Sequence, residues 1–326
     1  MIKKTLKFIA FCISFCLLVI YGIVPMRLRL IFLKIFSLVA TKIKPVFNLR
    51  LPPNEKILPL KDQIVMNTEE DACVHYSGGS DSTLVATYLA ENFRRVHLLT
   101  FCHCTISSVD NRTYNIRNLK RIYGNDRFVF QLIDIDDLFR RMYLGRRFRD
   151  FCRYFLFTLV PCGTCRFAMH LRTIVYCIEN GIRYVSDGSN QFYQMANPSE
   201  MPSILALIRE LYASHGIQYM INPVYNKDDA DNELYEKGIV SRKDLRSDWN
   251  TYKKIQPICN CGLFFLIIAR TYWFYLHGVE HLSSTAFRYY QEKMPLYRRL
   301  IDKELSQRKT KACLKPSQLP PVKRVA

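Results

Sequence analysis

The stretch VHYSGGSDSTL, residues 74–84, decides the fold. An apolar run typical of a buried strand leads into it, and the residues from Asp81 onward have the pattern of a helix. The two glycines and three serines at 77–82 admit two interpretations, a plain turn or a loop that surrounds a phosphate. Glycine lets an anion approach the backbone, and the helix that follows adds the positive end of its dipole. The position between strand and helix favours the phosphate loop.

Short apolar runs alternate with amphipathic stretches from Asp71 onward. The pattern predicts strands at residues 72–76, 96–101, 128–133, 182–186 and 217–221, and helices at 81–92, 111–123 and 166–180. Strands that alternate with helices form parallel sheets, because the chain needs a long crossover to return to the same edge. The sequence therefore predicts an α/β domain with a parallel sheet and helices on both faces.

Positive charge is concentrated at the two ends of the 326-residue chain, whose formal net charge is +19. Residues 1–50 hold nine Lys or Arg and no acid, and residues 307–326 hold six and no acid. Basic ends fit an anionic membrane surface at least as well as nucleic acid. The twelve cysteines lack the spacing of a small disulfide-rich domain, and favour metal or sulfur chemistry in a reducing compartment.

The first fifty residues predict attachment to a membrane. Residues 8–26 carry no charge, and a helix of that length spans about 28 Å at roughly 1.5 Å per residue. No small-x-small cleavage pattern follows, so a retained anchor is favoured over a cleaved signal peptide. Residues 27–44 mix apolar residues with cations, as in a helix lying in the lipid interface or packed on the globular domain. Cations are denser after the span than before it, which predicts a single span with the bulk of the protein in the cytoplasm.

The motif SGGSDS resembles the SGGxDS signature of the PP-loop ATP pyrophosphatases, which split ATP between its α and β phosphates and adenylate a substrate oxygen. The resemblance covers about residues 70–262 and implies a HUP or Rossmann-like PP-loop domain at 71–262. Asp81 would repel phosphate unless it binds Mg²⁺ or caps the helix, and both roles are open. The candidate catalytic residues are Asp81, Ser82 and Cys162. The candidate ATP-binding residues are Ser77, Gly78, Gly79, Ser80, Asp81, Ser82, Asp187 and Gly188.

Two later segments extend the resemblance. PCGTCRFAMHLRTIVYCIENGIRYVSDGSN, residues 161–190, is similar to the tRNA-thiolating branch, in which a cysteine pair precedes a basic helix. NPVYNKDDADNELYEKGI, residues 222–239, resembles the late segment of the family. In the 2-thiocytidine synthetases of this branch, three cysteines hold a [4Fe–4S] cluster. The resemblance thus implies cluster ligands at Cys162, Cys165 and one of Cys259 and Cys261.

Other interpretations of these residues are open. The same four cysteines suit a tetrahedral Zn²⁺ site, a cysteine that carries a persulfide, or thiols that are only buried. The segment FCHCT, residues 101–105, offers Cys102, His103 and Cys104 as metal ligands or adenosine contacts, although such residues are more often packing. Residues 140–155 interleave cations with aromatic residues, which fits RNA, lipid headgroups or a solvated helix face.

The predicted function is ATP-dependent adenylation of a substrate oxygen with release of pyrophosphate, followed by sulfur transfer. The resemblance implies tRNA as substrate and a sulfur donor protein as partner. Two departures bear on this: the 2-thiocytidine enzymes usually have Lys where this chain has Ser80, and they are soluble. A small or lipid-linked substrate is therefore an alternative. Two other functions are an amide- or nitrile-forming ligase without sulfur chemistry, and a membrane-tethered nucleotide-binding module without catalysis.

The predicted organisation has five parts, and the sequence makes no prediction of oligomeric state. The anchor and basic helix occupy residues 1–50, and a linker with prolines occupies 51–70. The PP-loop domain follows at 71–262. A helical extension at 263–306 begins with an apolar stretch too short for a second span, and a basic tail at 307–326 is predicted to be disordered.

Overall fold

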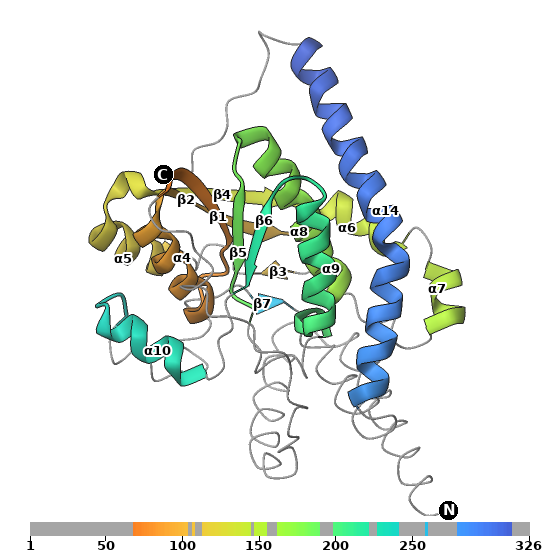
Figure 1. Ribbon diagram of the computed structural model, residues 1–326, viewed down its shortest axis with the longest axis horizontal. Helices are drawn as coiled ribbons and strands as arrows, with labels where there is room; N and C mark the ends of the chain where they lie inside the picture. The colour runs from red at the N-terminus through yellow and green to blue at the C-terminus, as the bar shows by residue number, and fades with distance from the viewer. Residues whose placement is uncertain are drawn as a thin grey trace, which may run out of the picture.

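The computed structural model describes residues 68–103, 106–107, 113–144, 147–154, 162–189, 198–221, 227–240, 258–259 and 279–314 (Figure 1). The predicted membrane segments at 8–26 and 27–44 and the apolar stretch that opens the helical extension lie outside these residues, and remain predictions. Within the described part of the chain, no helix combines the length and the apolar character needed to cross a bilayer.

A parallel sheet of five strands forms the centre of the domain, in the order β4-β2-β1-β5-β6. The strands are β1 (Thr68–His75), β2 (Phe93–Cys102), β4 (Phe128–Asp134), β5 (Tyr184–Asp187) and β6 (Gln218–Ile221). From β1 the chain builds outward through β2 and β4 on one side, and through β5 and β6 on the other. The strand order therefore reverses between β1 and β5, where such sheets open a crevice at the carboxyl ends of their strands.

Helices cover both faces of this sheet (Figure 1). One face carries α4 (Ser80–Asn92), α5 (Thr113–Tyr123) and α10 (Lys227–Glu236), and the other carries α6 (Asp136–Leu144), α8 (Cys162–Asn180), α9 (Pro202–Ala213) and α14 (Val279–Leu314). The remaining elements are α7 (Arg147–Tyr154) and the short 3-10 helices η3 (Asn125–Arg127) and η6 (Pro198–Glu200). Successive residues of β1 point to opposite faces of the sheet and belong to different hydrophobic clusters. Val74 packs in the cluster under α4, and Cys73 packs in the cluster under α8.

These elements confirm the predicted parallel sheet with helices on both faces. Two helices extend further than the sequence predicts. Helix α8 begins at Cys162 instead of residue 166, so the cysteine pair lies within its first turn and not before it. Helix α14 continues to Leu314, past residue 307 where the disordered tail was predicted to start. An ion pair between Arg308 and Glu179 of α8, at 2.7 Å, binds this part of α14 to the domain.

Helix α14 is packed against α8 and α9 along much of its 36 residues (Figure 1). Its aromatic side chains are buried there, and the ring of Phe167 in α8 stacks on Tyr290 and on Tyr297 with ring centroids 4.8 Å apart in each pair. Lys293 of α14 forms a buried ion pair with Asp150 of α7. These contacts make α14 part of the same hydrophobic core as α8.

A second, two-stranded sheet joins distant parts of the chain. Strands β3 (Ile106–Ser107) and β7 (Ile258–Cys259) are antiparallel, with Ile106 opposite Cys259. Because β3 follows β2 by only a few residues, this pairing brings the backbone of Cys259 to the segment that leaves the carboxyl end of β2. Neither strand was predicted, since two residues are too short to give a periodic pattern.

Candidate active site

The predicted phosphate loop closes on itself between β1 and α4. Gly78 has φ +83°, a left-handed conformation that glycine adopts without strain. The hydroxyl of Ser82 accepts a hydrogen bond from the Ser77 N–H at 3.2 Å and donates to the Gly79 carbonyl at 3.2 Å. Asn115 of α5 donates to the Gly78 carbonyl at 2.8 Å. The bend is therefore fixed by its own serines and by one side chain from a neighbouring helix.

The first turn of α4 is arranged as a phosphate site requires. Gly79 is its N-cap residue and contributes no side-chain cap, so the N–H groups of this turn are not covered by a capping side chain. Asp81 lies in the same turn. Backbone N–H groups and the helix dipole favour an anion at such a position.

The Asp187–Gly188 turn at the end of β5 lies directly against this first turn. A Cβ atom on Gly188 would lie 2.8 Å from the backbone nitrogen of Ser82 and 3.1 Å from the backbone carbon of Asp81. Any side chain at this position would collide with backbone, which cannot move aside as a flexible side chain can. The structure thus brings together two segments that the sequence singled out a hundred residues apart.

A buried network holds the Asp187 carboxylate at this turn. Its Oδ2 accepts hydrogen bonds from Arg166 of α8 at 2.8 Å and from Tyr219 of β6 at 2.7 Å. Its Oδ1 accepts from the N–H of Ser189 at 3.0 Å, and Arg166 also pairs with Glu200 at 3.2 Å. Burial raises the pKa of Asp187, but Arg166, the two nearby histidines and the hydrogen bond from Ser189 together outweigh it, and the pKa lies well below its ordinary value. The carboxylate is therefore ionised, and its position is fixed from several elements.

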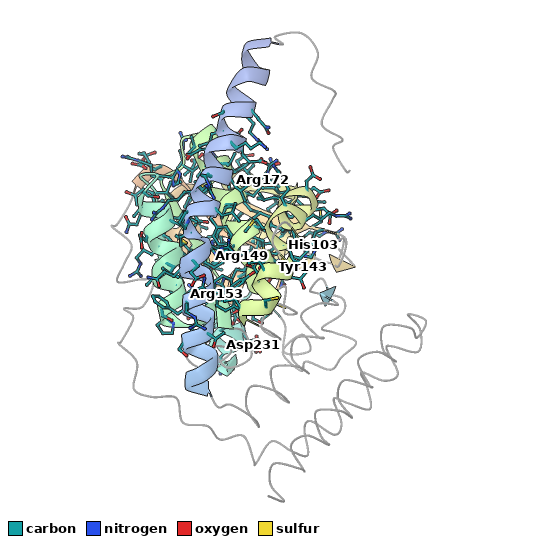
Figure 2. The ribbon with its side chains drawn as sticks, turned by 90° about the vertical axis from the view of Figure 1, so that its right-hand side faces the viewer. His103, Tyr143, Arg149, Arg153, Arg172 and Asp231 are labelled. Atoms are coloured by element: carbon teal, nitrogen blue, oxygen red, sulfur yellow. The ribbon has the colours of Figure 1, made fainter. Side chains whose placement is uncertain are left out.

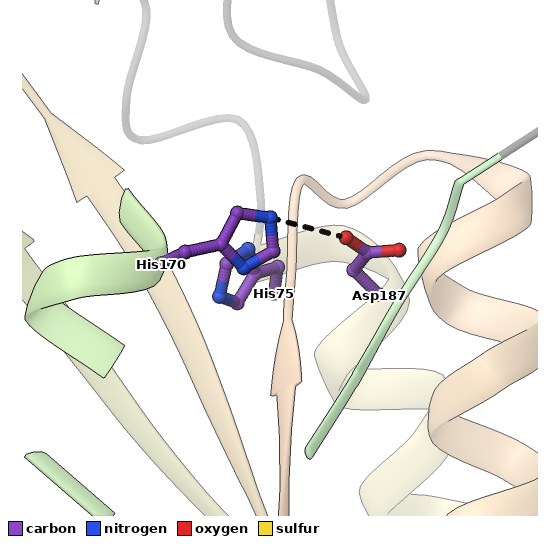
Figure 3. A group of neighbouring side chains, drawn as sticks. All are labelled: His75, His170 and Asp187. Carbon is purple, nitrogen blue, oxygen red and sulfur yellow. Dashed lines mark ion pairs between the residues drawn. The ribbon is translucent and has the colours of Figure 1, made fainter. Parts of the chain in front are cut away.

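Two histidines complete the network (Figure 3). The rings of His75 and His170 lie 4.5 Å apart, and His170 Nε2 is 3.7 Å from Asp187 Oδ2. Nε2 of His75 contacts the Thr173 hydroxyl at 2.7 Å, and Nδ1 of His170 contacts the Tyr212 hydroxyl at 3.0 Å. Burial lowers the pKa of His75 to about 4 and that of His170 well below its ordinary value. Both rings are therefore neutral at pH 7.

This cluster has the ligand types of a metal site but not its electrostatics. Among the described residues, His75, His170 and Asp187 form the one group of three whose candidate ligand atoms all lie within 4.8 Å of one another. A divalent cation there would face the guanidinium of Arg166, which already binds Asp187 and lies 3.4 Å from His170 Nε2. Removing that arginine would leave buried charge uncompensated. We interpret the cluster as a hydrogen-bonded support for the β5 turn.

The cysteine pair lies at the start of α8, one residue from this network. Cys165 is buried, and its Sγ lies 3.2 Å from Nε2 of His103, the residue that follows β2. Cys162 is partly buried. Between them, a Cβ atom on Gly163 would lie 1.4 Å from the Tyr290 hydroxyl, so α14 covers this turn. Cys259 comes near the carboxyl end of β2 through the β3–β7 pairing, while Cys261 lies outside the described residues.

Helix α8 therefore joins two ends of the site: the predicted phosphate loop with the Asp187–Gly188 turn, which we call the phosphate end, and the cysteine pair with His103, which we call the sulfur end. Cys165 faces the sulfur end, and the next residue, Arg166, binds Asp187 at the phosphate end. Sequence reasoning missed the roles of His75, Arg166 and Tyr290. The place of His75 two residues before the phosphate loop is a clue to its role, whereas nothing in the sequence links Tyr290 to the cysteines.

The basic segment at 140–155 is partly neutralised in the structure. Arg140 pairs with Asp136 within α6, Arg141 pairs with Glu304 of α14, and Arg153 pairs with Glu292 of α14. These three arginines are therefore paired with carboxylates of α6 and α14. This favours the interpretation of the segment as a solvated helix face.

Comparison with known proteins gives only distant similarities. No family model and no curated protein matches the sequence. A solved 4-thiouridine synthetase–RNA complex with bound ATP is 14% identical, covers 74% of this chain and 54% of its own, and has a TM-score of 0.41. The U34-tRNA thiolase NcsA from Methanococcus maripaludis, solved with its [4Fe-4S] cluster, is 14% identical, with 74% of each chain covered and a TM-score of 0.35.

A third solved structure is a predicted subunit of tRNA methyltransferase from Methanocaldococcus jannaschii. It is 18% identical, covers 51% of this chain and 75% of its own, and has a TM-score of 0.35. Two of these three proteins are thiolating enzymes by name, the kind that the sequence motifs resemble. The likeness is too distant to carry an argument about function, which rests on the residues of the site.

Proposed function

We propose that this protein is an ATP-using enzyme of the PP-loop type that joins AMP to a substrate oxygen and then replaces that oxygen with sulfur. The observation that supports this best is the union of both ends of the site on one helix. In the first turn of α8, Cys165 faces His103, while Arg166 reaches the turn that packs on the phosphate loop. Activation and sulfur delivery need such neighbouring sites, because the activated carbon must meet the sulfur before water does.

The phosphate end would activate the substrate. Backbone N–H groups of the loop and of the first turn of α4 would hold the pyrophosphate portion of ATP, with Asp81 holding Mg²⁺. The substrate oxygen attacks the α-phosphorus, the bond from that phosphorus to the bridging oxygen breaks, and pyrophosphate leaves. Gly188 lets the β5 turn approach the loop closely, so the nucleotide is held from two sides.

The sulfur end would complete the exchange. Sulfur attacks the activated carbon, the carbon–oxygen bond breaks, and AMP leaves with the original oxygen. Cys162 and Cys165 would supply thiolates for an iron–sulfur cluster or for zinc, together with Cys259, whose backbone the β3–β7 pairing brings to the segment that follows β2. A bound cluster would supply an open iron for sulfide, whereas zinc would hold thiolates in place. Buried His103 would exclude water from the Cys165 side.

The test is the identity of the products formed from ATP. The full-length protein in detergent is incubated with ATP, Mg²⁺, sulfide and unfractionated tRNA, and AMP, ADP and pyrophosphate are separated. We expect AMP and pyrophosphate, reduced at least about 100-fold in Asp81→Asn. Asp126→Asn, at an exposed position in η3, is the matched control. Release of ADP, or equal turnover in Asp81→Asn, would refute the proposal, and ATP binding without any product would favour the tethered nucleotide-binding module.

We also propose that residues 1–50 attach the protein to an anionic membrane with the PP-loop domain on the cytoplasmic side. Support comes from the uncharged stretch at 8–26 and from the nine Lys and Arg residues within residues 1–50. Flotation with vesicles that contain anionic lipid is the measurement. The full chain should float with the vesicles, and a chain that lacks residues 1–50 should remain at the bottom of the gradient. Equal behaviour of the two chains would contradict the anchor.

A further inference from the structure

The buried contact between Cys165 and His103 is not explained by the packing of the core alone. Both side chains are nearly inaccessible, at 8% and 6% exposure, yet they meet through polar atoms, Sγ and Nε2, 3.2 Å apart. A contact of this length between sulfur and a ring nitrogen is a hydrogen bond. An apolar side chain would fill the same space without it.

The His103 ring is held in one orientation by its surroundings. Phe139 of α6 packs against it with ring centroids 4.9 Å apart, and Phe139 stacks in turn on Tyr143 at 5.5 Å. His103 and Tyr143 are both labelled in Figure 2. Burial lowers the pKa of His103, while the nearby carboxylates of Asp136 and Asp134 act in the opposite sense. The ring is thus fixed from the α6 side, with its Nε2 directed at Cys165.

A hydrogen bond to sulfur has a chemical consequence in a dry site. An N–H donor stabilises negative charge on a thiolate, whether the thiolate is a nucleophile or a ligand. Cys73 and Cys177 make a useful contrast, because these fully buried thiols lie in the same core and have each other as neighbours. Cys165, in contrast, combines a place at the start of a helix with a contact to a histidine.

We propose that His103 is a positioning residue for Cys165, holding its sulfur in place through the contact with Nε2. The inference rests on the proposed function, because it assigns the cysteine end of the site to sulfur chemistry. His103 itself does not touch the substrate in this proposal. It determines where the Cys165 sulfur points.

Alkylation of individual cysteines tests this without ATP, substrate or product. The full-length protein is reduced, freed of metal with a chelator and treated with iodoacetamide at one fixed pH. Peptide mass spectrometry then gives a rate for each cysteine in the wild type, His103→Gln and His103→Leu. His215→Leu, in the turn after α9, is the control variant, and thermal unfolding confirms that each variant is folded.

We expect Cys165 to react at least about 10-fold faster than Cys177 in the wild type, because Cys165 lies at the start of α8 with a hydrogen-bond partner on its sulfur, whereas Cys177 is fully buried. His103→Leu should remove most of this advantage, and His103→Gln should keep part of it through its amide N–H. Exposed Cys152 should react equally in all variants. A wild-type Cys165 no faster than Cys177, or an equal or faster rate in His103→Leu, would overturn the proposal. Failure of the enzyme to form thiolated product would refute the proposed function and leave these rates unaffected.

Discussion

The phosphate end and the sulfur end of the site are formed by different chemical groups, backbone in the first and side chains in the second. The phosphate end is mainly backbone: a glycine turn, the first turn of α4, and the close approach of Gly188 to Ser82. The sulfur end is made of side chains, from α8, the end of β2 and α14. A backbone site depends on local conformation, whereas a side-chain site depends on how distant elements pack. The two ends should therefore respond differently to substitution.

The Arg166–Asp187 pair joins these two ends and should have the largest effect on stability. Arg166→Met leaves a buried carboxylate uncompensated, which costs about 3–5 kcal/mol. Arg183→Met breaks an exposed pair with Glu70 and should cost less than about 1 kcal/mol. Denaturant unfolding of the full chain is the measurement. The double variant Arg166→Met/Asp187→Asn should recover part of the loss. Equal losses of stability in Arg166→Met and Arg183→Met would show that the Arg166–Asp187 pair is not essential to the site.

At the phosphate end, Gly188→Ala should affect activity more than stability. The added Cβ would force the β5 turn away from the Ser82 nitrogen, and a displacement of about 1 Å can reduce turnover about 100-fold. The loss of stability should be about 1–3 kcal/mol. Gly181→Ala is the matched control, because it has φ +66° and no atom within 4 Å of the added Cβ, so it should destabilise the chain without slowing AMP formation. Equal AMP formation by Gly188→Ala and the wild type would contradict the two-sided phosphate site.

At the sulfur end, Gly163→Ala should act through packing. Its Cβ would overlap the Tyr290 hydroxyl, and Tyr290 is buried and stacked on Phe167, so it cannot move freely. We expect a loss of about 1–3 kcal/mol in denaturant unfolding. Adding Tyr290→Phe removes the hydroxyl and should restore part of that stability. A Gly163→Ala variant as stable as the wild type would show that α14 does not cover the cysteine turn.

The histidine network predicts a gradual effect, a dependence of stability on pH. The pKa of His75 is lowered to about 4, whereas an unfolded histidine titrates near about 6.5. The unfolded chain therefore binds more protons in this window, and stability falls as pH drops from about 6.5 to about 4, by at most about 1.4 kcal/mol per pH unit for this group. His170, whose pKa is also lowered, destabilises the fold in the same direction as the pH drops. Asp187 contributes a further loss of stability below about pH 4, where its carboxylate takes up a proton in the unfolded chain. His75→Phe should reduce the slope, and an unchanged slope would contradict this assignment.

The comparison also explains what the sequence could predict. The phosphate end was predicted because strand, glycine turn and helix follow one another along the chain, so local rules apply. Asp187 and Gly188 were found because they end a recognisable strand. The cysteine pair was found by its spacing, but its place inside α8 was not, because Pro161 precedes Cys162 in the sequence instead of the Ser, Thr, Asp or Asn that usually marks a helix start.

The contacts between distant residues at the sulfur end escaped prediction for a physical reason. His103 approaches Cys165 only because β2 and α8 are brought together by the fold, and Tyr290 approaches Gly163 from more than a hundred residues away. Contacts of this kind leave no periodicity and no motif. The same is true of β3 and β7, whose pairing places Cys259 near the end of β2.

The most direct test of the central claim counts AMP and sulfur together. The full-length protein is given ATP, Mg²⁺, labelled sulfide and tRNA, and AMP and labelled nucleoside are measured in the same reaction. The account predicts one AMP formed for each sulfur incorporated, with both lost in Asp81→Asn. ADP as the nucleotide product, or sulfur incorporated without AMP, would contradict it.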